Sequence, residues 1–263
     1  MTLIRTQPGR IWRITLARPD HRNAVNAAML GELIRALGDA AADRDARVVV
    51  LSGEGRHFCA GADIDELARA TEGPDGIDYG RALEEVMRSI EHLPVPALAV
   101  VQGSALGAGC QLVVACDLAI AATDATFGIP SGRLGVVVGY ENIQRLVLAV
   151  GPKRAGALLL GTRTISGQEA ADWGLVGEAV PPEDLPDRAL LYAEEIADAA
   201  PLSVQGSKRG IRQVLSRLSI DREAEGFRVA DFDMMAAHAF GSEDLQEGIA
   251  AFRERRDPEF RGR

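Results

Sequence analysis

Short apolar runs that alternate with amphipathic stretches are the feature that most constrains how this chain folds. Residues 48–51, 97–101 and 118–121 are runs of the kind that form buried strands, and residues 11–16 alternate apolar with polar side chains. Between residues 11–16 and residues 48–51, residues 24–42 carry apolar side chains at helical spacing. Strands that are separated by helices in this way predict an α/β fold.

The second half of the chain is predominantly helical by the same criteria, with glycine and proline at the joints. The predicted helices are residues 143–149, 153–160, 167–173, 185–199, 204–215, 222–240 and 242–254. Ser242 is a favourable N-cap for the last of these helices. Residues 71–79 are rich in glycine and aspartate, and we expect them to form a mobile loop within the domain.

Charge and composition exclude several classes of protein. The 263 residues include 29 basic and 38 acidic side chains, a formal net charge of -9, which disfavours general nucleic-acid binding. No run reaches the roughly 18 apolar residues of a membrane span, and the N-terminus lacks the apolar core of a signal peptide. The three cysteines have no metal-ligand spacing, so they predict buried thiols in a cytoplasmic protein and no metal site.

Two segments of small residues each follow a predicted buried strand. They are CAGADI at residues 59–64 and GSALGAGCQL at residues 103–112. One interpretation is tight packing of a turn on the sheet. The other is that exposed backbone N–H groups bind an oxygen that becomes negative during a reaction, an arrangement worth roughly 3 kcal/mol per donor. The second segment also begins a helix, whose dipole favours an anion at its N-terminus.

With these segments in place, the chain resembles the enoyl-coenzyme A hydratase/isomerase, or crotonase, superfamily along nearly its whole length. The matching segments are ARPDHRNAVN (17–26), HFCAGADIDEL (57–67), VQGSALGAGCQL (101–112), CDLAIAATDATFGIP (116–130), GTRTISGQEAADWGLV (161–176) and EGIAAFRERRDPEF (247–260). Each match is modest by itself, but their order and spacing together are specific.

The resemblance implies a spiral of ββα units over residues 1–200 and a C-terminal helical region over residues 201–263. This region would belong to the same domain, cover the active site and assemble the chain into homotrimers or homohexamers. The expected oxyanion hole is formed by the N–H groups of Ala62 and Ala108, which would bind the thioester carbonyl of an acyl-coenzyme A. The resemblance implies no cofactor other than the coenzyme A of the substrate.

The same resemblance implies which residues line the substrate site. His21, Arg22 and Ala24 fall where family members contact the coenzyme A nucleotide, and Phe252 and Arg255 match C-terminal positions that approach it. An arginine has a physical affinity for phosphate. The remaining predicted binding residues are Ala60, Asp63, Ile64, Gln111, Ser131 and Tyr140.

The chain departs from a hydratase of this family at the two catalytic positions. Such a hydratase uses two glutamates, and here these positions are Gln111 and Ser131. Neither an amide nor an unassisted hydroxyl can cycle a proton at neutral pH, so ordinary two-glutamate hydration is not expected. Gln111 can still orient water or substrate through hydrogen bonds.

Tyr140 and Glu141 stand where other family members place their acid or base. Glu141 is either an acidic residue that the helix dipole favours in a first turn, or a carboxylate that moves protons near the enolate carbon. Tyr140 is either a packing residue or a hydrogen-bond donor to substrate. These two residues are the conspicuous substitutions in LGVVVGYENIQRL, residues 134–146.

The leading hypothesis is an enzyme that isomerises a double bond, with a hydrolase-type reaction next, through an oxyanion-stabilised enolate and with Glu141 as proton carrier. The alternatives are a non-catalytic acyl-coenzyme A binding protein and a hydratase with non-standard acid and base residues. A dinucleotide-binding loop is excluded because GSALGAG does not have G-x-G-x-x-G spacing.

Overall fold

The computed structural model describes residues 3–71, 75–218 and 229–263, in which a six-stranded sheet forms the centre of the fold. Its strands, in spatial order, are β1 (Ile4–Gln7), β2 (Ile11–Leu16), β3 (Val48–Gly53), β4 (Ala97–Val101), β6 (Leu118–Ala122) and β9 (Glu178–Val180). β1 pairs with β2 in an antiparallel manner, and the remaining pairs are parallel. The predicted strands are therefore confirmed, and the mixed α/β class with them.

A second, three-stranded sheet contains β5 (Ser104–Leu106), β7 (Thr126–Gly128) and β8 (Thr164–Ser166). β4 and β6 of the large sheet are each followed by a short strand of this small sheet and then by a helix. β3 is followed similarly by Cys59, which forms an isolated parallel bridge with Ala105. The chain thus repeats a ββα unit, and each unit turns from the large sheet to the small one.

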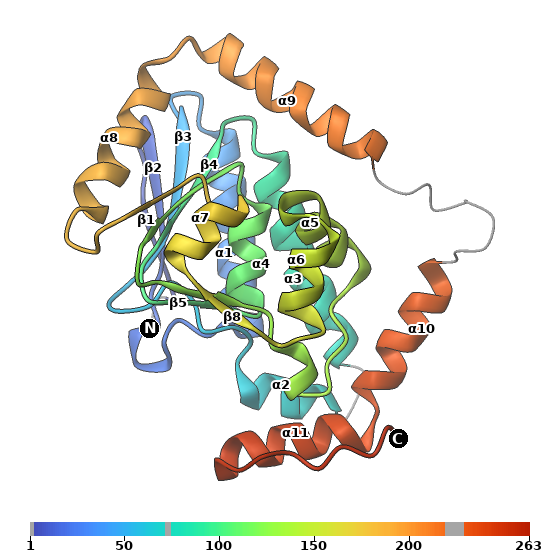
Figure 1. Ribbon diagram of the computed structural model, residues 1–263. Helices are drawn as coiled ribbons and strands as arrows, with labels where there is room; N and C mark the ends of the chain where they lie inside the picture. Colours follow the sequence, from blue (N-terminus) through green and yellow to red (C-terminus); the bar gives the residue numbers. More distant parts are fainter. Residues whose placement is uncertain (1–2, 72–74, 219–228) are drawn as a thin grey trace.

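Helices cover both faces of the large sheet (Figure 1). α1 (Ala27–Ala42), α3 (Asp75–His92) and α4 (Ala108–Ala115) lie together on one side, while α8 (Leu185–Asp198) contacts β2, β3, β4 and β6 from the other. α1 begins at Ala27, later than the predicted residue 24, because the side chain of Asn26 caps it by accepting a hydrogen bond from the Met29 N–H at 2.9 Å.

Apart from α2 (Ile64–Thr71), the other helices agree with the predicted helical second half. They are α5 (Tyr140–Val150), α6 (Pro152–Leu159), α7 (Gly167–Trp173), α9 (Pro201–Leu218), α10 (Val229–Phe240) and α11 (Glu243–Glu254), with short 3-10 turns at Pro19–His21 and Ser131–Arg133. Ser242 caps α11 as predicted, since its hydroxyl accepts a hydrogen bond from the Leu245 N–H. Residues 222–228 of the predicted helix 222–240 lie outside the described residues.

The predicted loop at residues 71–79 is wrong in part. Residues 72–74 lie outside the described residues, but α3 begins at Asp75, so residues 75–79 are helical. Tyr79 is buried, and its hydroxyl donates a hydrogen bond to the Val25 carbonyl at 3.2 Å. Glycine and aspartate have low helix propensity, but this tertiary contact supports the first turns of the helix.

The C-terminal helices lie at the periphery. Figure 1 shows α9 extending away from the body at one end of the molecule and α10 and α11 at the other. The buried Lys208 fastens α9, because its ammonium group donates to the Val95 carbonyl at 2.9 Å and to Asp117 Oδ2 at 2.6 Å. None of the helices in the described ranges combines the length and the apolar character that crossing a bilayer requires.

Candidate active site

The two small-residue segments lie against each other. The Cys59 N–H donates to the Ser104 carbonyl at 2.9 Å, and the Leu106 N–H donates to the Cys59 carbonyl at 3.0 Å. Gly61 and Gly107, one in each segment, adopt φ values of 111° and 51°, which side chains with a Cβ rarely tolerate. These glycines let both turns change direction at the same place, so that the residue after each one faces a common space.

Ala62 and Ala108 are the residues that follow these two glycines. In the part of the chain that the structure describes, neither the Ala62 N–H nor the Ala108 N–H donates a hydrogen bond to a protein acceptor. Ala108 is also the first residue of α4, so its N–H lies at the positive end of the helix dipole. The two groups line one cavity, and they have the properties required of oxyanion-hole donors.

This cavity has a volume of about 2240 Å³ and brings together nearly all of the predicted site residues. Those that line it are His21, Arg22, Ala24, Ala60, Ala62, Asp63, Ile64, Ala108, Gln111, Ser131, Glu141, Phe252 and Arg255. They come from segments that are distant in the sequence, including the 3-10 turn before α1, the start of α4 and the end of α11.

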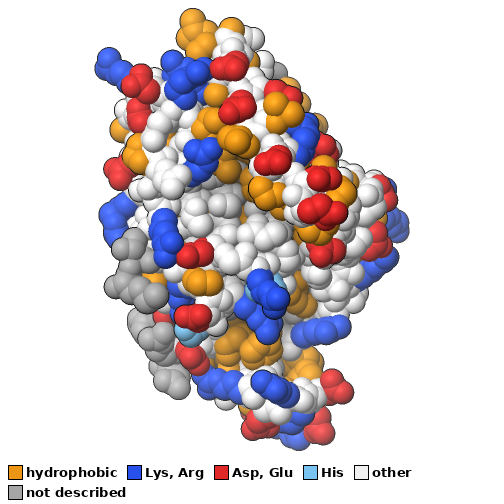
Figure 2. Space-filling view, turned by 90° about the vertical axis from the view of Figure 1, so that its left-hand side faces the viewer, with side chains coloured by type: hydrophobic (Ala, Val, Ile, Leu, Met, Phe, Trp, Pro, Cys, Tyr) orange, Lys and Arg blue, Asp and Glu red, His pale blue; other side chains and the backbone are white. Residues whose placement is uncertain are grey.

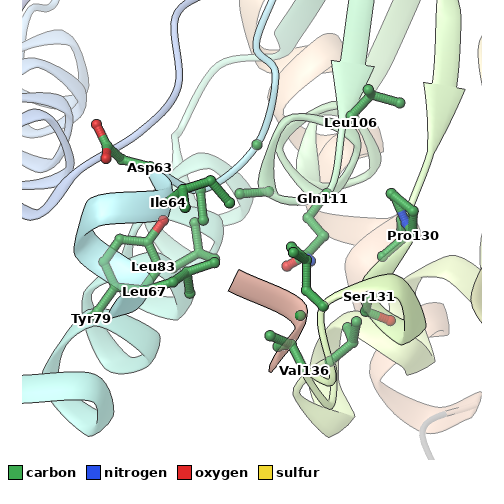
Figure 3. A pocket seen from close by; sticks show the side chains of 18 of the residues that line it. Asp63, Ile64, Leu67, Tyr79, Leu83, Leu106, Gln111, Pro130, Ser131 and Val136 are labelled. Carbon is green, nitrogen blue, oxygen red and sulfur yellow. The ribbon is translucent and has the colours of Figure 1, made fainter. Parts of the chain in front are cut away.

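Gln111 projects into the cavity from α4 (Figure 3). Its side chain is buried, and its Oε1 atom has no hydrogen-bond partner within the described residues. Ser131, in the second 3-10 turn, lies on the same side of the cavity, while Ile64, Leu67 and Leu83 form an apolar surface across from it. An amide and a hydroxyl therefore line this side of the cavity, and neither provides an acid or base at neutral pH.

The adjacent residues Tyr140 and Glu141 point to different surroundings. Tyr140 does not contribute to the cavity lining; its ring packs edge-to-face on Phe232 of α10, with 5.8 Å between the ring centroids. Glu141 does line the cavity, and its Oε1 atom lies 3.7 Å from Nη2 of Arg88. Of the two, only Glu141 presents an ionisable group to a bound molecule.

Asp63 follows the first donor and is held by a neighbouring cation. Arg18 Nη2 lies 3.0 Å from Asp63 Oδ2, and both side chains are largely buried. Burial raises the pKa of the Asp63 carboxyl, but the Arg18 hydrogen bond and charge, with the Asp65 N–H, outweigh it and lower that pKa below its ordinary value. Asp63 is thus an ionised residue that fixes the turn carrying Ala62, since its N–H also donates to the Val25 carbonyl.

The residues predicted to contact the nucleotide occupy the exposed rim of the cavity. His21 and Arg22 lie at the 3-10 turn before α1, and both are exposed. Phe252 is 61% exposed on α11, and Arg255 caps the same helix in a left-handed conformation. A rim that carries cations and an aromatic ring has the chemistry to bind a phosphorylated nucleotide.

Sequence reasoning did not single out the individual side chains of α3 that line the cavity. Tyr79, Glu84 and Arg88 all line it, and Glu84 and Arg88 are joined by a hydrogen bond of 3.0 Å. Their i, i+4 spacing is visible in the sequence and predicts such a pair. It does not reveal that the pair faces a cavity, because the other partner of Glu84, Arg145, lies on α5.

The cysteines take no part in this chemistry. Burial raises the pKa of the Cys59 and Cys110 thiols to about 12, so both are neutral at physiological pH, and Cys116 is partly buried. Over residues 3–71, 75–218 and 229–263, no three His, Cys, Asp or Glu side chains are grouped as metal ligands would be.

The fold agrees with comparisons to known proteins. The family model described as enoyl-CoA hydratase/isomerase matches residues 6–263, and the chain belongs to this family of acyl-coenzyme A-processing enzymes. It is similar to 2,3-dehydroadipyl-CoA hydratase of Escherichia coli K12, with 35% identity over 99% of both chains. It is also similar to a probable enoyl-CoA hydratase of Rhizobium meliloti 1021, with 39% identity over 99% of this chain and 98% of that one.

Among solved structures, a methylmalonyl-CoA decarboxylase in complex with 2-nitronate-propionyl-CoA superposes with a TM-score of 0.88. It is 27% identical, and the alignment covers 100% of this chain and 99% of that one. The crotonase fold, with its C-terminal helical region, is thereby confirmed. Members that are hydratases and a member that is a decarboxylase share it, so the fold alone does not define the reaction.

Proposed function

We propose that this chain isomerises the double bond of an enoyl-coenzyme A thioester, through an enolate held by the N–H groups of Ala62 and Ala108. One observation carries the proposal. Two backbone donors that have no protein acceptor among the described residues face the same cavity as Glu141, while the positions of the two hydratase glutamates hold Gln111 and Ser131. A site that combines two oxyanion donors with a carboxylate in the cavity wall is suited to moving one proton between two carbons.

In the proposed reaction, the Glu141 carboxylate removes a proton from C2 of a 3-enoyl thioester. The C–H electron pair forms a C1–C2 double bond, and the carbonyl π pair moves to the thioester oxygen, which becomes negative and accepts hydrogen bonds from the two N–H groups. The protonated Glu141 then returns the proton to C4, which leaves the double bond between C2 and C3. Gln111 orients the substrate by hydrogen bonding and takes no proton.

Hydration is a second candidate, and the names of the relatives favour it, since both of the curated proteins described above are called hydratases. In that reaction Glu141 would remove a proton from water and deliver one to C2, replacing the two glutamates. Gln111 would then accept a hydrogen bond from the attacking water.

The substrate is proposed to bind through its nucleotide at the cationic rim formed by Arg22 and Arg255, so that the thioester reaches the two alanine N–H groups. No cofactor beyond the coenzyme A of the substrate is required by this chemistry. We also expect the protein to reside in the cytoplasm, where such thioesters are metabolised.

We further propose that copies of the chain associate as trimers or hexamers through the C-terminal helices. Ile211, Val214, Leu215 and Leu218 form an apolar stripe at i, i+3, i+4 and i+7 on α9, and all four are exposed. Figure 2 shows further hydrophobic side chains at the height of α8 and α9, where Leu190, Leu191 and Leu202 are exposed. A contiguous apolar surface of this kind is typical of a protein interface. Light scattering would show a mass of three or six chains if this is correct and of one chain if it is not.

The test of the reaction is mass-resolved chromatography of 2-enoyl, 3-enoyl and β-keto thioesters after incubation with the protein. Conversion of a 3-enoyl thioester to a 2-enoyl thioester at unchanged mass supports the proposal, and a gain of one water by a 2-enoyl thioester supports hydration instead. Cleavage of a β-keto thioester would indicate a hydrolase. Saturable binding without conversion of any of these thioesters would indicate a binding protein.

The first prediction concerns Glu141, the proposed proton carrier. Glu141→Gln keeps the shape of the side chain but cannot accept a proton, so turnover should fall by about 10²–10⁴-fold. Binding of a saturated acyl-coenzyme A, measured by calorimetry, should be nearly unchanged. The control is Glu183→Gln, which removes an exposed carboxylate outside the cavity. Full activity of the Glu141→Gln variant would remove Glu141 from the mechanism.

A further inference from the structure

A cluster of charged side chains joins α3 to α5 at the cavity, and the proposed chemistry uses only one of its members. We call Glu84, Arg88, Glu91, Glu141 and Arg145 the α3–α5 charge cluster. Glu84, Arg88 and Glu141 line the cavity, whereas Glu91 and Arg145 do not contribute to its lining. The cluster thus has an outer layer that a substrate can meet and an inner layer that supports it.

Arg145 is the centre of the inner layer. Its guanidinium makes five hydrogen bonds, two to Glu84, two to Glu91 and one to Asn142 Oδ1, with lengths between 2.7 and 3.0 Å. An arginine has five N–H donors, so all of them are used. Burial raises the pKa of Glu84, but the Arg145 and Arg88 hydrogen bonds outweigh it and lower that pKa below the ordinary 4.5. Arg145 therefore holds Glu84 as a fixed, ionised carboxylate.

Arg88 links this fixed carboxylate to Glu141. Its Nε atom donates to Glu84 Oε1 at 3.0 Å, and its Nη2 atom lies 3.7 Å from Glu141 Oε1. The guanidinium is planar, so once Nε is bound the direction of Nη2 is fixed. Arg145 is already balanced by Glu84 and Glu91, which leaves Arg88 as the cation of the cluster that faces the Glu141 carboxylate.

We infer that Arg88 is a positioning residue for Glu141, which it holds as an oriented carboxylate at the wall of the cavity, and that Glu84 in turn holds Arg88. The inference rests on the proposed role of Glu141. Arg88 itself exchanges no proton. Its effect on the reaction is to limit the conformations of the Glu141 side chain, so that the carboxylate is ready when the thioester binds.

The test is a double-mutant cycle on Arg88→Met and Glu141→Gln. Arg88→Met should lower kcat about fivefold, the effect expected when an ion pair between half-exposed groups is lost. The dissociation constant of a saturated acyl-coenzyme A should stay within about twofold. In the Glu141→Gln background, Arg88→Met should have no further effect on the residual turnover, because the carboxylate that it positions is absent.

Two further variants separate positioning from a general effect on folding. Arg88→Lys keeps the charge and should recover part of kcat, and added guanidinium should partly restore turnover in an Arg88→Ala variant. The matched control is Arg35→Met, which removes an exposed arginine of α1 that lies outside the cavity lining. Its kcat should be unchanged.

The inference is overturned if Arg88→Met leaves kcat unchanged, or lowers it equally with and without the Glu141 carboxylate. A fivefold loss that appears in KM and not in kcat would also overturn it, because Arg88 would then bind substrate directly. These results leave the role of Glu141 intact. Failure of the proposed function is distinct, since it requires full activity in the Glu141→Gln variant alone.

Discussion

The cavity is bounded on one side by the turns at residues 59–63 and 103–108, which present backbone N–H groups, and on another by α3 and α5, which present charged side chains. The turns are held by backbone hydrogen bonds between Cys59, Ser104 and Leu106. The helices are held together by Arg145, which binds Glu84, and by the ion pair of Arg88 with Glu141. The first wall, which we call the backbone wall, therefore depends on how closely the two turns approach each other. The second, which we call the charged wall, depends on the balance of charge between α3 and α5.

This difference predicts different sensitivities to substitution. The backbone wall should tolerate many changes of side chain, provided that no additional atom separates the two turns. The charged wall should be sensitive to the loss of a single charged side chain, because the partner ion is then left buried and unpaired, which is costly in free energy. Three substitutions test this contrast.

The largest effect on turnover and stability is expected for Gly109→Ala. A Cβ atom at Gly109 would overlap the Cys59 carbonyl oxygen and lie 2.8 Å from the Cys59 Cβ atom, so α4 would have to move away from the first turn. The movement should displace the Ala108 N–H, lower turnover about 10²-fold or more, and cost about 3 kcal/mol of unfolding free energy. Turnover assays and urea unfolding measure the two effects.

Gly38→Ala is the matched control, since a Cβ atom at that position of α1 meets nothing within 4 Å. It should increase the stability by roughly 0.5–1 kcal/mol, because alanine is the better helix former. Equal behaviour of the two alanine variants would show that the contact between the turns does not hold the site.

An intermediate effect is expected for Arg145→Met, which leaves Glu84 and Glu91 without their main cation. At pH 7 the variant should lose about 2 kcal/mol of unfolding free energy, less than for a fully buried pair because the carboxylates are partly exposed. The lowered pKa of Glu84 stabilises the folded protein above pH 4.5, and this contribution is lost as the pH falls through the lowered value.

The difference between the Arg145→Met variant and the parent protein should therefore narrow as the pH falls from about 4.5, the ordinary pKa of an unfolded glutamate, through the lowered pKa of Glu84 in the folded protein. Urea unfolding at pH 7 and pH 4 compares the two proteins. A difference that is independent of pH would show that Arg145 acts through packing and not through the charge of Glu84.

The smallest effect is expected for Tyr79→Phe, at the place where α3 approaches the backbone wall. The Tyr79 hydroxyl donates to the Val25 carbonyl, which also accepts a hydrogen bond from the Asp63 N–H. Because that second bond remains, the loss should be at the low end of a hydrogen-bond deletion, about 0.5–1 kcal/mol. Thermal unfolding measures the loss, and a loss of turnover would contradict the view that Tyr79 only supports the fold.

The two walls also differ in how far the sequence predicted them. CAGADI and GSALGAGCQL each follow a buried strand, and the resemblance placed the donors at Ala62 and Ala108, which the structure brings to one cavity. Local sequence is informative there, because glycine conformation and the start of a helix depend on adjacent residues. The role of the two donors in the reaction remains a prediction.

The charged wall was only partly predictable. Glu141 was recognised by its place in the chain, but its neighbour Tyr140 lies outside the cavity lining and packs on Phe232. The direction of each side chain depends on how α5 is rotated against α10 and α3, and adjacent helical residues point about 100° apart.

The sequence alone was therefore sufficient for β2, β3, β4 and β6 of the large sheet, for most of the helices and for the turns that carry the backbone donors, because each depends on periodicity or on a few neighbouring residues. It did not predict the small sheet. Only the tertiary structure placed Arg145 on Glu84, which is 61 residues away, and Arg18 on Asp63, which is 45 residues away. Such pairs leave no local pattern. Charged residues of both signs are abundant in the chain, and folding selects which of them meet in a site shielded from water.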